Sequence, residues 1–270
     1  MININGNLYK NIDSNNINDF NFIINNFNFY EEIHFENELM FFWEDHFFRI
    51  MASLRRLRYK IPISFNKEFL KNELIKTIKA NKLEKKNGNI KFYFFSKPNE
   101  NKIDYLINIS NSKLYINHDL KTKIICDIYN EEFISAVQLS NLSITNQTIR
   151  RIAHVYSIEN GLNACIMINE KKNIVESTIG NLYLIKDNKI ITPNLTSGCQ
   201  NLAIRSSFNR WAKKNLKLEE IDINIYEIQQ CDEMFFLSIS KGYTSVNNFR
   251  KTTYKSNLGR KIFNNFILSI

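Results

Sequence analysis

The sequence predicts an α/β (α+β) fold with two domains. Apolar residues alternate as in strands over some stretches and recur at helical spacing over others, along all 270 residues. The polar stretch 117–122 (Asn-His-Asp-Leu-Lys-Thr) interrupts this pattern, so we expect a small N-terminal domain at 1–118 and a larger C-terminal domain at 123–270. Hydrophobic residues make up 44% of the chain, with 21 Phe and 12 Tyr, which is enough for both domains to have a core.

The first domain is expected to contain two helices and several short strands. We expect strands at 1–4, 6–9, 29–35, 39–42, 89–95 and 103–109, because strand-like apolar runs there are separated by turn-forming residues. The spacing of Phe48, Met51 and Ala52 predicts a helix at 44–59, which Pro62 stops. A second amphipathic helix is expected at 65–82.

The second domain is expected to be richer in strands. The same reasoning predicts strands at 123–129, 164–169, 174–176, 182–185, 189–191, 221–225 and 233–238. Helices are expected at 148–159, 202–214 and 254–267. Gly161 follows the first of these helices at a position where glycine commonly ends a helix in the left-handed conformation.

The formal charge of +9 does not by itself indicate a nucleic-acid partner. Basic residues are dispersed among Asn and Glu, and their one cluster, 55–60, falls at the expected end of a helix. A solvated helix end explains that cluster better than a phosphate-binding patch does. We therefore expect no nucleic-acid binding.

Targeting and metal-binding patterns are missing from the sequence. No apolar run approaches the roughly 20 residues needed to cross a bilayer. The start has no basic region followed by an apolar one, so we expect a cytoplasmic protein without a membrane segment. The four cysteines are scattered without metal-ligand spacing, which indicates reduced thiols and no metal site.

Two motifs in this order are shared with a known family. The first spans 30–33 (Tyr-Glu-Glu-Ile) and 43–50, where Arg49 follows His46 by three residues. The second is an alternating run that ends in Val-Glu-Ser and is followed by Gly-Asn-Leu-Tyr-Leu-Ile and Ile-Thr-Pro. The order resembles that of the class IV aminotransferases. These fold-type IV pyridoxal phosphate (PLP) enzymes include branched-chain and D-amino-acid transaminases and aminodeoxychorismate lyase.

The resemblance implies a fold, a cofactor and partners. It implies the two-domain fold-type IV architecture with the site at the domain junction, PLP as cofactor, a homodimer, and amino acid or 2-oxo acid substrates. Arg49 matches the arginine that binds the cofactor phosphate, for which a guanidinium offers two parallel hydrogen bonds. Glu176 matches the glutamate that keeps the pyridine nitrogen protonated. The alternatives are that Arg49 only pairs with a carboxylate and that Glu176 is an exposed strand-end residue.

Further cofactor-binding positions follow from the same resemblance. Asn181 is expected to be a structural polar residue beside the site. The backbone amides of Ala203 and Ile204 match a phosphate-binding helix N-terminus. Ser240 matches a second element that contacts the phosphate with small hydroxyl and amide groups.

The sequence departs from the family pattern at three positions. Ser143 stands where the family has its Schiff-base lysine when Asn146 is aligned with the family's asparagine, and no lysine lies between 140 and 170. A serine hydroxyl forms no imine and is no amine base. Gln147 replaces a tyrosine that contacts the ring oxygen, and Leu202 replaces the glycine of the phosphate-binding turn.

Three functional hypotheses remain open at this point. The first is a PLP-type transaminase or an aminodeoxychorismate-lyase-like enzyme. The second is a non-catalytic homologue, or pseudoenzyme, that keeps a dimeric scaffold and binds a phosphate-bearing or anionic ligand. The third is a different reaction in which Arg49 and Arg205 bind a new acidic ligand.

Overall fold

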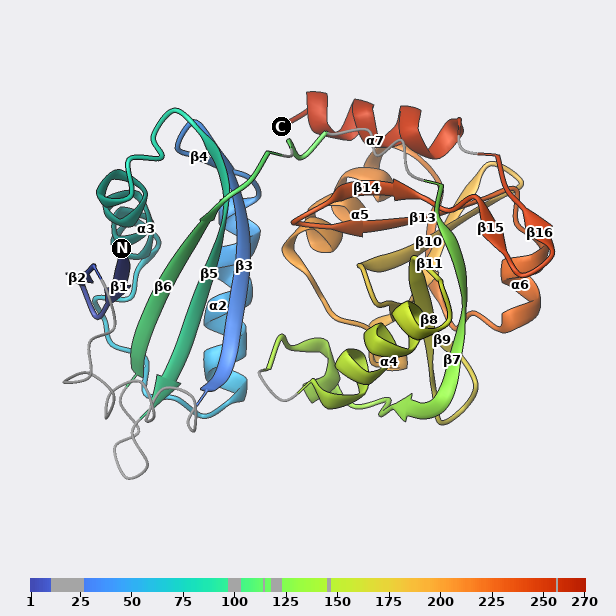
Figure 1. The fold of residues 1–270 in the computed structure, drawn as a ribbon, viewed down its shortest axis with the longest axis horizontal. Coiled ribbons are helices and arrows are strands. Elements are labelled where there is room, and N and C mark those ends of the chain that lie inside the picture. The colour runs from blue at the N-terminus through green and yellow to red at the C-terminus, as the bar shows by residue number, and fades with distance from the viewer. Residues whose placement is uncertain (11–26, 97–102, 114, 118–122, 145–146, 256) are drawn as a thin grey trace. The chain divides into compact units, whose positions relative to one another are not determined.

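A computed structural model describes the chain at residues 1–10, 27–96, 103–113, 115–117, 123–144, 147–255 and 257–270 (Figure 1). The chain divides into two compact units: Met1–Tyr115 together with Ser143–Asn146, and Ile116–Leu142 together with Gln147–Ile270. Most of the polar stretch expected at 117–122, and Asn146, lie outside the described residues. No helix in the described part of the chain is long and apolar enough to cross a membrane.

The first unit is built on an antiparallel sheet with the strand order β2-β1-β6-β5-β3-β4 (Figure 1). Its strands are β1 (Ile2–Ile4), β2 (Asn7–Tyr9), β3 (Phe27–Glu36), β4 (Leu39–Met40), β5 (Asn87–Ser96) and β6 (Ile103–Asn111). Its helices are α2 (Trp43–Arg56) and α3 (Lys67–Ala80). All eight of these elements were predicted from the sequence, with small differences in their bounds.

One face of this sheet forms the core of the first unit. Ile90, Phe92 and Phe94 alternate along β5, and all three are fully buried in one cluster with residues of α2 and α3 such as Leu54 and Leu74. Period-two alternation on a strand places every second side chain on the same face, so β5 supplies three core residues from five positions. The helices thus cover this face, and α2 is held against β3.

The second unit contains two five-stranded sheets, with the orders β12-β11-β10-β13-β14 and β16-β15-β7-β8-β9. The strands are β7 (Ile125–Ile134), β8 (Ala164–Asn169), β9 (Ile174–Ser177), β10 (Asn181–Lys186), β11 (Lys189–Pro193), β12 (Leu218–Ile221), β13 (Glu233–Ser238), β14 (Gly242–Ser245), β15 (Asn248–Phe249) and β16 (Thr252–Thr253). The helical segments are η2 (Gln138–Asn141), α4 (Thr148–Glu159), η3 (Leu195–Ser197), α5 (Ala203–Asn215), α6 (Ile225–Gln230) and α7 (Leu258–Leu268).

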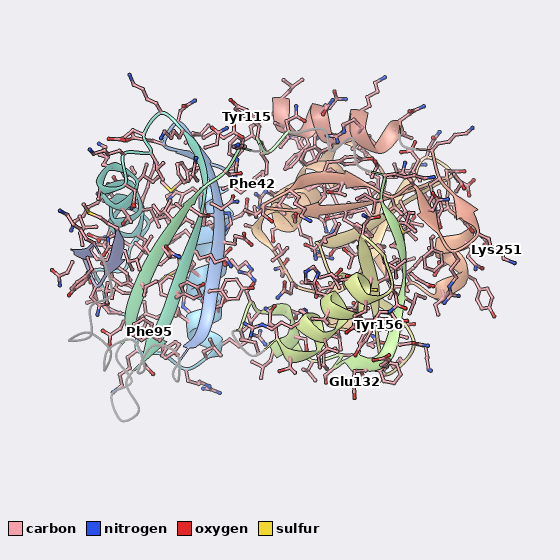
Figure 2. All side chains as sticks on the ribbon, in the orientation of Figure 1. Phe42, Phe95, Tyr115, Glu132, Tyr156 and Lys251 are labelled. Carbon is pink, nitrogen blue, oxygen red and sulfur yellow. The ribbon has the colours of Figure 1, made fainter. Side chains whose placement is uncertain are left out.

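Helix α4 is fixed to its sheet by aromatic contact. The ring of Tyr156, labelled in Figure 2, meets the buried Tyr129 of β7 edge to face, with centroids 5.4 Å apart. The helix spans the predicted residues, and Gly161 follows its C-cap with φ of 66°, as expected for a glycine at that position. This contact packs the C-terminal half of α4 against β7.

Three predicted elements need correction. The strand expected at 221–225 lies at Leu218–Ile221, where it pairs in parallel with β11, and Ile225 instead begins α6. Asn224 starts this helix because its side chain accepts hydrogen bonds from the first turn, while Glu227 closes a capping box. The helix expected at 44–59 ends at Arg56, before Pro62, and the last helix begins at Leu258.

The last helix is capped by a distant carboxylate. Glu233, at the start of β13, accepts hydrogen bonds from the backbone N–H groups of Asn257, Leu258 and Gly259 at 2.8–3.1 Å. These donors lack partners within their own helix, and a negative charge beside them is favoured by the helix dipole. A side chain of β13 therefore fixes the start of α7.

Candidate functional site

In the first unit, a buried polar cluster surrounds Arg49. Glu31 of β3 forms an ion pair with Arg49 of α2 through Oε2 and Nη1. The other oxygen of Glu31 lies 2.6 Å from Nδ1 of His46, which makes Nδ1 the protonated ring nitrogen because a carboxylate only accepts. His46 and Arg49 lie three residues apart on α2 and reach the same carboxylate from one side of the helix.

Ser143 belongs to this cluster. Its hydroxyl oxygen accepts a hydrogen bond of 2.7 Å from Nη2 of Arg49, and its carbonyl accepts one of 2.9 Å from the backbone of Tyr30. The side chain is buried, and the Arg49 guanidinium also lies over the ring of Phe29 at 5.6 Å. Ser143 is thus fixed on both its backbone and its side chain, next to a strand of the first unit.

In the second unit, Glu176 of β9 is buried and held from two directions. Its Oε1 lies 2.6 Å from Nε of Arg150, in the first turn of α4. Its Oε2 accepts a hydrogen bond of 2.8 Å from the backbone N–H of Gln200. Glu176 is therefore not the exposed strand-end carboxylate that was one alternative from the sequence.

The turn after Glu176 is shaped by close backbone contact. A Cβ atom on Gly180 would lie 2.3 Å from the carbonyl oxygen of Leu237, so only glycine fits between β9 and β10. Asn181 follows as the first residue of β10, and its side-chain amide donates to the carbonyl of Gln200 at 2.8 Å. Glu176 thus binds the backbone N–H of Gln200, and Asn181 binds the carbonyl of the same residue. This contact fits a structural role for Asn181.

Helix α5 begins at Ala203, with Ile204 beside it, and both side chains are buried. Leu202 is the N-cap and makes no side-chain capping bond. In the first turn of α5, Nη2 of Arg205 donates to the carbonyl of Pro193 and to Oε2 of Glu220, both at 2.7 Å. The structure therefore joins Arg205 to a carboxylate of its own unit.

The loop before α5 contains a buried thiol, that of Cys199. The Sγ of Cys199 lies 3.3 Å from the carbonyl of Asn194, and burial raises the pKa of this thiol to about 11. A neutral, buried thiol serves as a small apolar side chain here rather than as a nucleophile. The four cysteines are all buried and unpaired, and the described residues contain no cluster that could hold a metal ion.

The two remaining predicted residues lie in different surroundings. Gln147 is the N-cap of α4, and its buried side-chain nitrogen has no hydrogen-bond partner among the described residues. Ser240 lies in the turn between β13 and β14 and is half-buried. Neither contacts the groups around Glu176 through a hydrogen bond found among the described residues.

The partners of the site residues were not predicted from the sequence. Glu31 lies inside the first motif, which assigns it no role, and neither motif includes Arg150. A signal was available for Arg150, because an arginine in the first turn of a helix is disfavoured by the helix dipole and so needs a nearby carboxylate or carbonyl groups. Nothing in the sequence pattern pointed to the backbone of Gln200.

Comparison with known proteins assigns the chain to a family. The family of amino-transferase class IV matches residues 28–249, which is most of the sequence. The chain belongs to the class IV aminotransferase family. A curated relative, the "Probable branched-chain-amino-acid aminotransferase" of Thermotoga maritima, is 25% identical over 217 residues, covering 77% of this chain and 72% of that protein.

Solved structures share the class IV aminotransferase fold. The branched-chain amino acid aminotransferase of Escherichia coli superposes with a TM-score of 0.82 at 16% identity, covering 98% of this chain and 93% of that one. A Legionella pneumophila protein assigned as a 4-amino-4-deoxychorismate lyase has a TM-score of 0.79 at 20% identity and covers 92% of both chains. These likenesses confirm the predicted α/β fold of type IV.

The residues of this chain do not fit PLP held as the family resemblance implies. Ser143 carries a hydroxyl that already accepts a hydrogen bond from Arg49, and that arginine is paired with Glu31. Glu176 faces the cationic side chain of Arg150 instead of presenting an unpaired carboxylate. Both charged groups assigned to the cofactor therefore have protein partners of opposite charge.

Proposed function

We propose that this class IV aminotransferase family protein is a non-catalytic homologue that does not tether PLP covalently. The observation that carries the proposal is the position of Ser143, which we place where the family has its Schiff-base lysine. Its hydroxyl lies 2.7 Å from Arg49 and has no chemistry that could form an imine. The protein would then use the family fold as a dimeric scaffold or as a binding protein for an anionic small molecule.

Two further features support this proposal. Gln147, which we place at the tyrosine position, has a buried side-chain nitrogen for which the described part of the chain offers no hydrogen-bond partner. Leu202, which we place at the glycine position, is the N-cap of α5 and makes no side-chain capping bond. At that position its side chain would hinder the close backbone approach that a phosphate-binding turn needs. Loss of three roles at once supports a changed site more strongly than one substitution would.

Covalent labelling tests the proposal directly. The purified protein is incubated with PLP, reduced with borohydride, and digested for mass spectrometry. We expect no visible absorbance band after removal of free PLP, and no single lysine peptide carrying a stoichiometric pyridoxyl group. Complete labelling of one lysine would overturn the proposal. Because many exposed lysines can react weakly, labelling in urea-unfolded protein serves as the background control.

The variant Ser143→Lys provides a matched comparison. It restores the amine but not the tyrosine and glycine roles, so we expect it to show no transaminase turnover even if it binds PLP. A variant with robust turnover would mean that Gln147 and Leu202 do not limit the site. The oligomer is tested separately by light scattering, for which we propose a homodimer.

A catalytic transaminase or lyase remains the second candidate, because the family match covers residues 28–249 and the relatives include both kinds of enzyme. Assays with branched-chain and D-amino acids plus a 2-oxo acid acceptor, and with aminodeoxychorismate, decide between the two. Turnover well above that of a heat-denatured sample would establish this candidate and remove the first.

A new anionic ligand at Arg49 and Arg205 is less well supported. Arg49 pairs with Glu31, and Arg205 pairs with Glu220 at 2.7 Å. An anion at either guanidinium would have to compete with a carboxylate that is already in place. Ligand-detected binding against a panel of anionic metabolites would test this alternative.

A further inference from the structure

Arg150 joins four segments of the second unit. Its Nε donates to Glu176 of β9 at 2.6 Å, and its Nη2 reaches the carbonyl groups of Ser140 and Gly198 at 3.1 and 3.3 Å. Arg150 itself lies in the first turn of α4. The guanidinium therefore connects η2, α4, β9 and the loop before α5 with one planar group, which suits arginine better than lysine.

The pair between Arg150 and Glu176 is well shielded from water. The arginine side chain is 15% exposed and the glutamate side chain 4%. At such burial a carboxylate without a cationic partner is strongly disfavoured, so Arg150 supplies the compensating positive charge beside Glu176. The backbone N–H of Gln200 satisfies the second oxygen at 2.8 Å.

The loop before α5 packs closely against the backbone of Ser135 at Gly198. Gly198 has φ of 97°, which glycine adopts without strain, and a Cβ there would lie 2.7 Å from the carbonyl oxygen of Ser135. Its own carbonyl accepts from Arg150. The loop is therefore held close to the η2 region by a glycine on one side and by the guanidinium on the other.

We propose that Arg150 is an internal counter-cation that takes the place of a protonated heteroaromatic ring at Glu176, so that the second unit is complete without a cofactor. The carboxylate is then closed to an added pyridinium, and becomes open to one only when the arginine side chain is removed. This inference concerns non-covalent binding at Glu176 and does not depend on the assignment of Ser143. This inference can therefore be wrong while the proposed function is right, and the proposed function can be wrong while this inference is right.

The experiment uses the full chain with one reporter per unit. The sequence has two tryptophans, Trp43 in the first unit and Trp211 in the second. In a Trp43→Phe background, fluorescence on heating follows the second unit alone. We expect Arg150→Ala to lower the midpoint by roughly 5–15 °C. The matched control is Arg151→Ala, the exposed neighbour on α4, which should shift the midpoint by no more than about 2 °C.

Chemical rescue separates charge neutralisation from simple packing. Millimolar guanidinium chloride or N-methylpyridinium chloride should raise the midpoint of Arg150→Ala relative to sodium chloride at equal ionic strength. Neither cation should stabilise the parent protein, in which Arg150 is present. The double variant Arg150→Ala/Glu176→Gln should not respond to either cation, because no carboxylate remains to be neutralised.

The unfolding midpoints of these variants decide whether Arg150 acts as the counter-cation of Glu176. An Arg150→Ala midpoint equal to that of Arg151→Ala would overturn it, as would stabilisation of the parent protein by N-methylpyridinium to the same extent as the variant. If Arg150→Ala yields no folded protein, the double variant decides: recovery of folded protein supports an uncompensated charge at Glu176, and an equally unfolded double variant overturns it.

Discussion

The cluster around Glu31 offers the sharpest test of how the first unit is held together. Glu31→Gln keeps the size of the side chain but removes its charge. It leaves Arg49 buried without its carboxylate and weakens the bond of 2.6 Å to His46. Breaking a buried ion pair by removing one partner costs about 3–5 kcal/mol.

The expected effect is large enough to measure by urea unfolding. With a urea dependence of about 2 kcal/mol per molar for a unit of this size, the midpoint should fall by roughly 1.5–2.5 M. The measurement follows the fluorescence of Trp43 in a Trp211→Phe background, so that only the first unit is reported. Unit-specific signals are needed because a chain of two units need not unfold in one step.

A surface carboxylate on α2, the helix that carries Arg49, provides the control. Glu44 pairs with Lys67 at 3.0 Å, with side chains 65% and 50% exposed. Such a pair contributes little, so Glu44→Gln should change the free energy of unfolding by no more than about 0.5 kcal/mol. If Glu31→Gln moves the midpoint no further than Glu44→Gln does, the ion pair does not stabilise the unit as argued.

Three further predictions concern the second unit. Gly180→Ala should destabilise it by about 1–3 kcal/mol, since the added methyl group meets the carbonyl of Leu237, and wild-type stability would contradict the packing described. Asn224→Ala should cost about 1 kcal/mol by removing the cap of α6, measured by the urea midpoint, and an unchanged midpoint would count against the capping box. Cys199 has a folded pKa of about 11, raised from 9.0 by burial, so its contribution to stability is complete below pH 9 and is lost as the pH rises towards 11. Urea midpoints of Cys199→Ala and the parent protein between pH 8 and 11 would test this, and parallel curves would refute it.

Much of the fold followed from the sequence, because local patterns decide it. The bounds of β8, β13 and α4 were predicted, since a continuous apolar run or a helical stripe of apolar residues marks each of them. The helix α6 was missed although Asn224 and Glu227 have the spacing of a capping box, because the apolar residues Ile221, Ile223 and Ile225 favoured a strand.

The candidate site could be predicted only in part. Glu176 and Asn181 were located through a local motif, and both lie buried around the loop that contains Gln200. The pairings of Arg150 with Glu176 and of Arg49 with Glu31 join residues 26 and 18 positions apart in the chain. Such contacts depend on how strands and helices pack, which spacing along one element does not encode.

The carboxylate of Glu233 that caps α7 has a consequence for biosynthesis. Because its three donors are Asn257, Leu258 and Gly259, the carboxylate of Glu233 in β13 lacks these hydrogen-bond partners until the start of α7 has left the ribosome exit tunnel. A premature stop codon shortly before Asn257 should therefore yield a product that chaperones and proteases recognise, even though every sheet strand has already been synthesised.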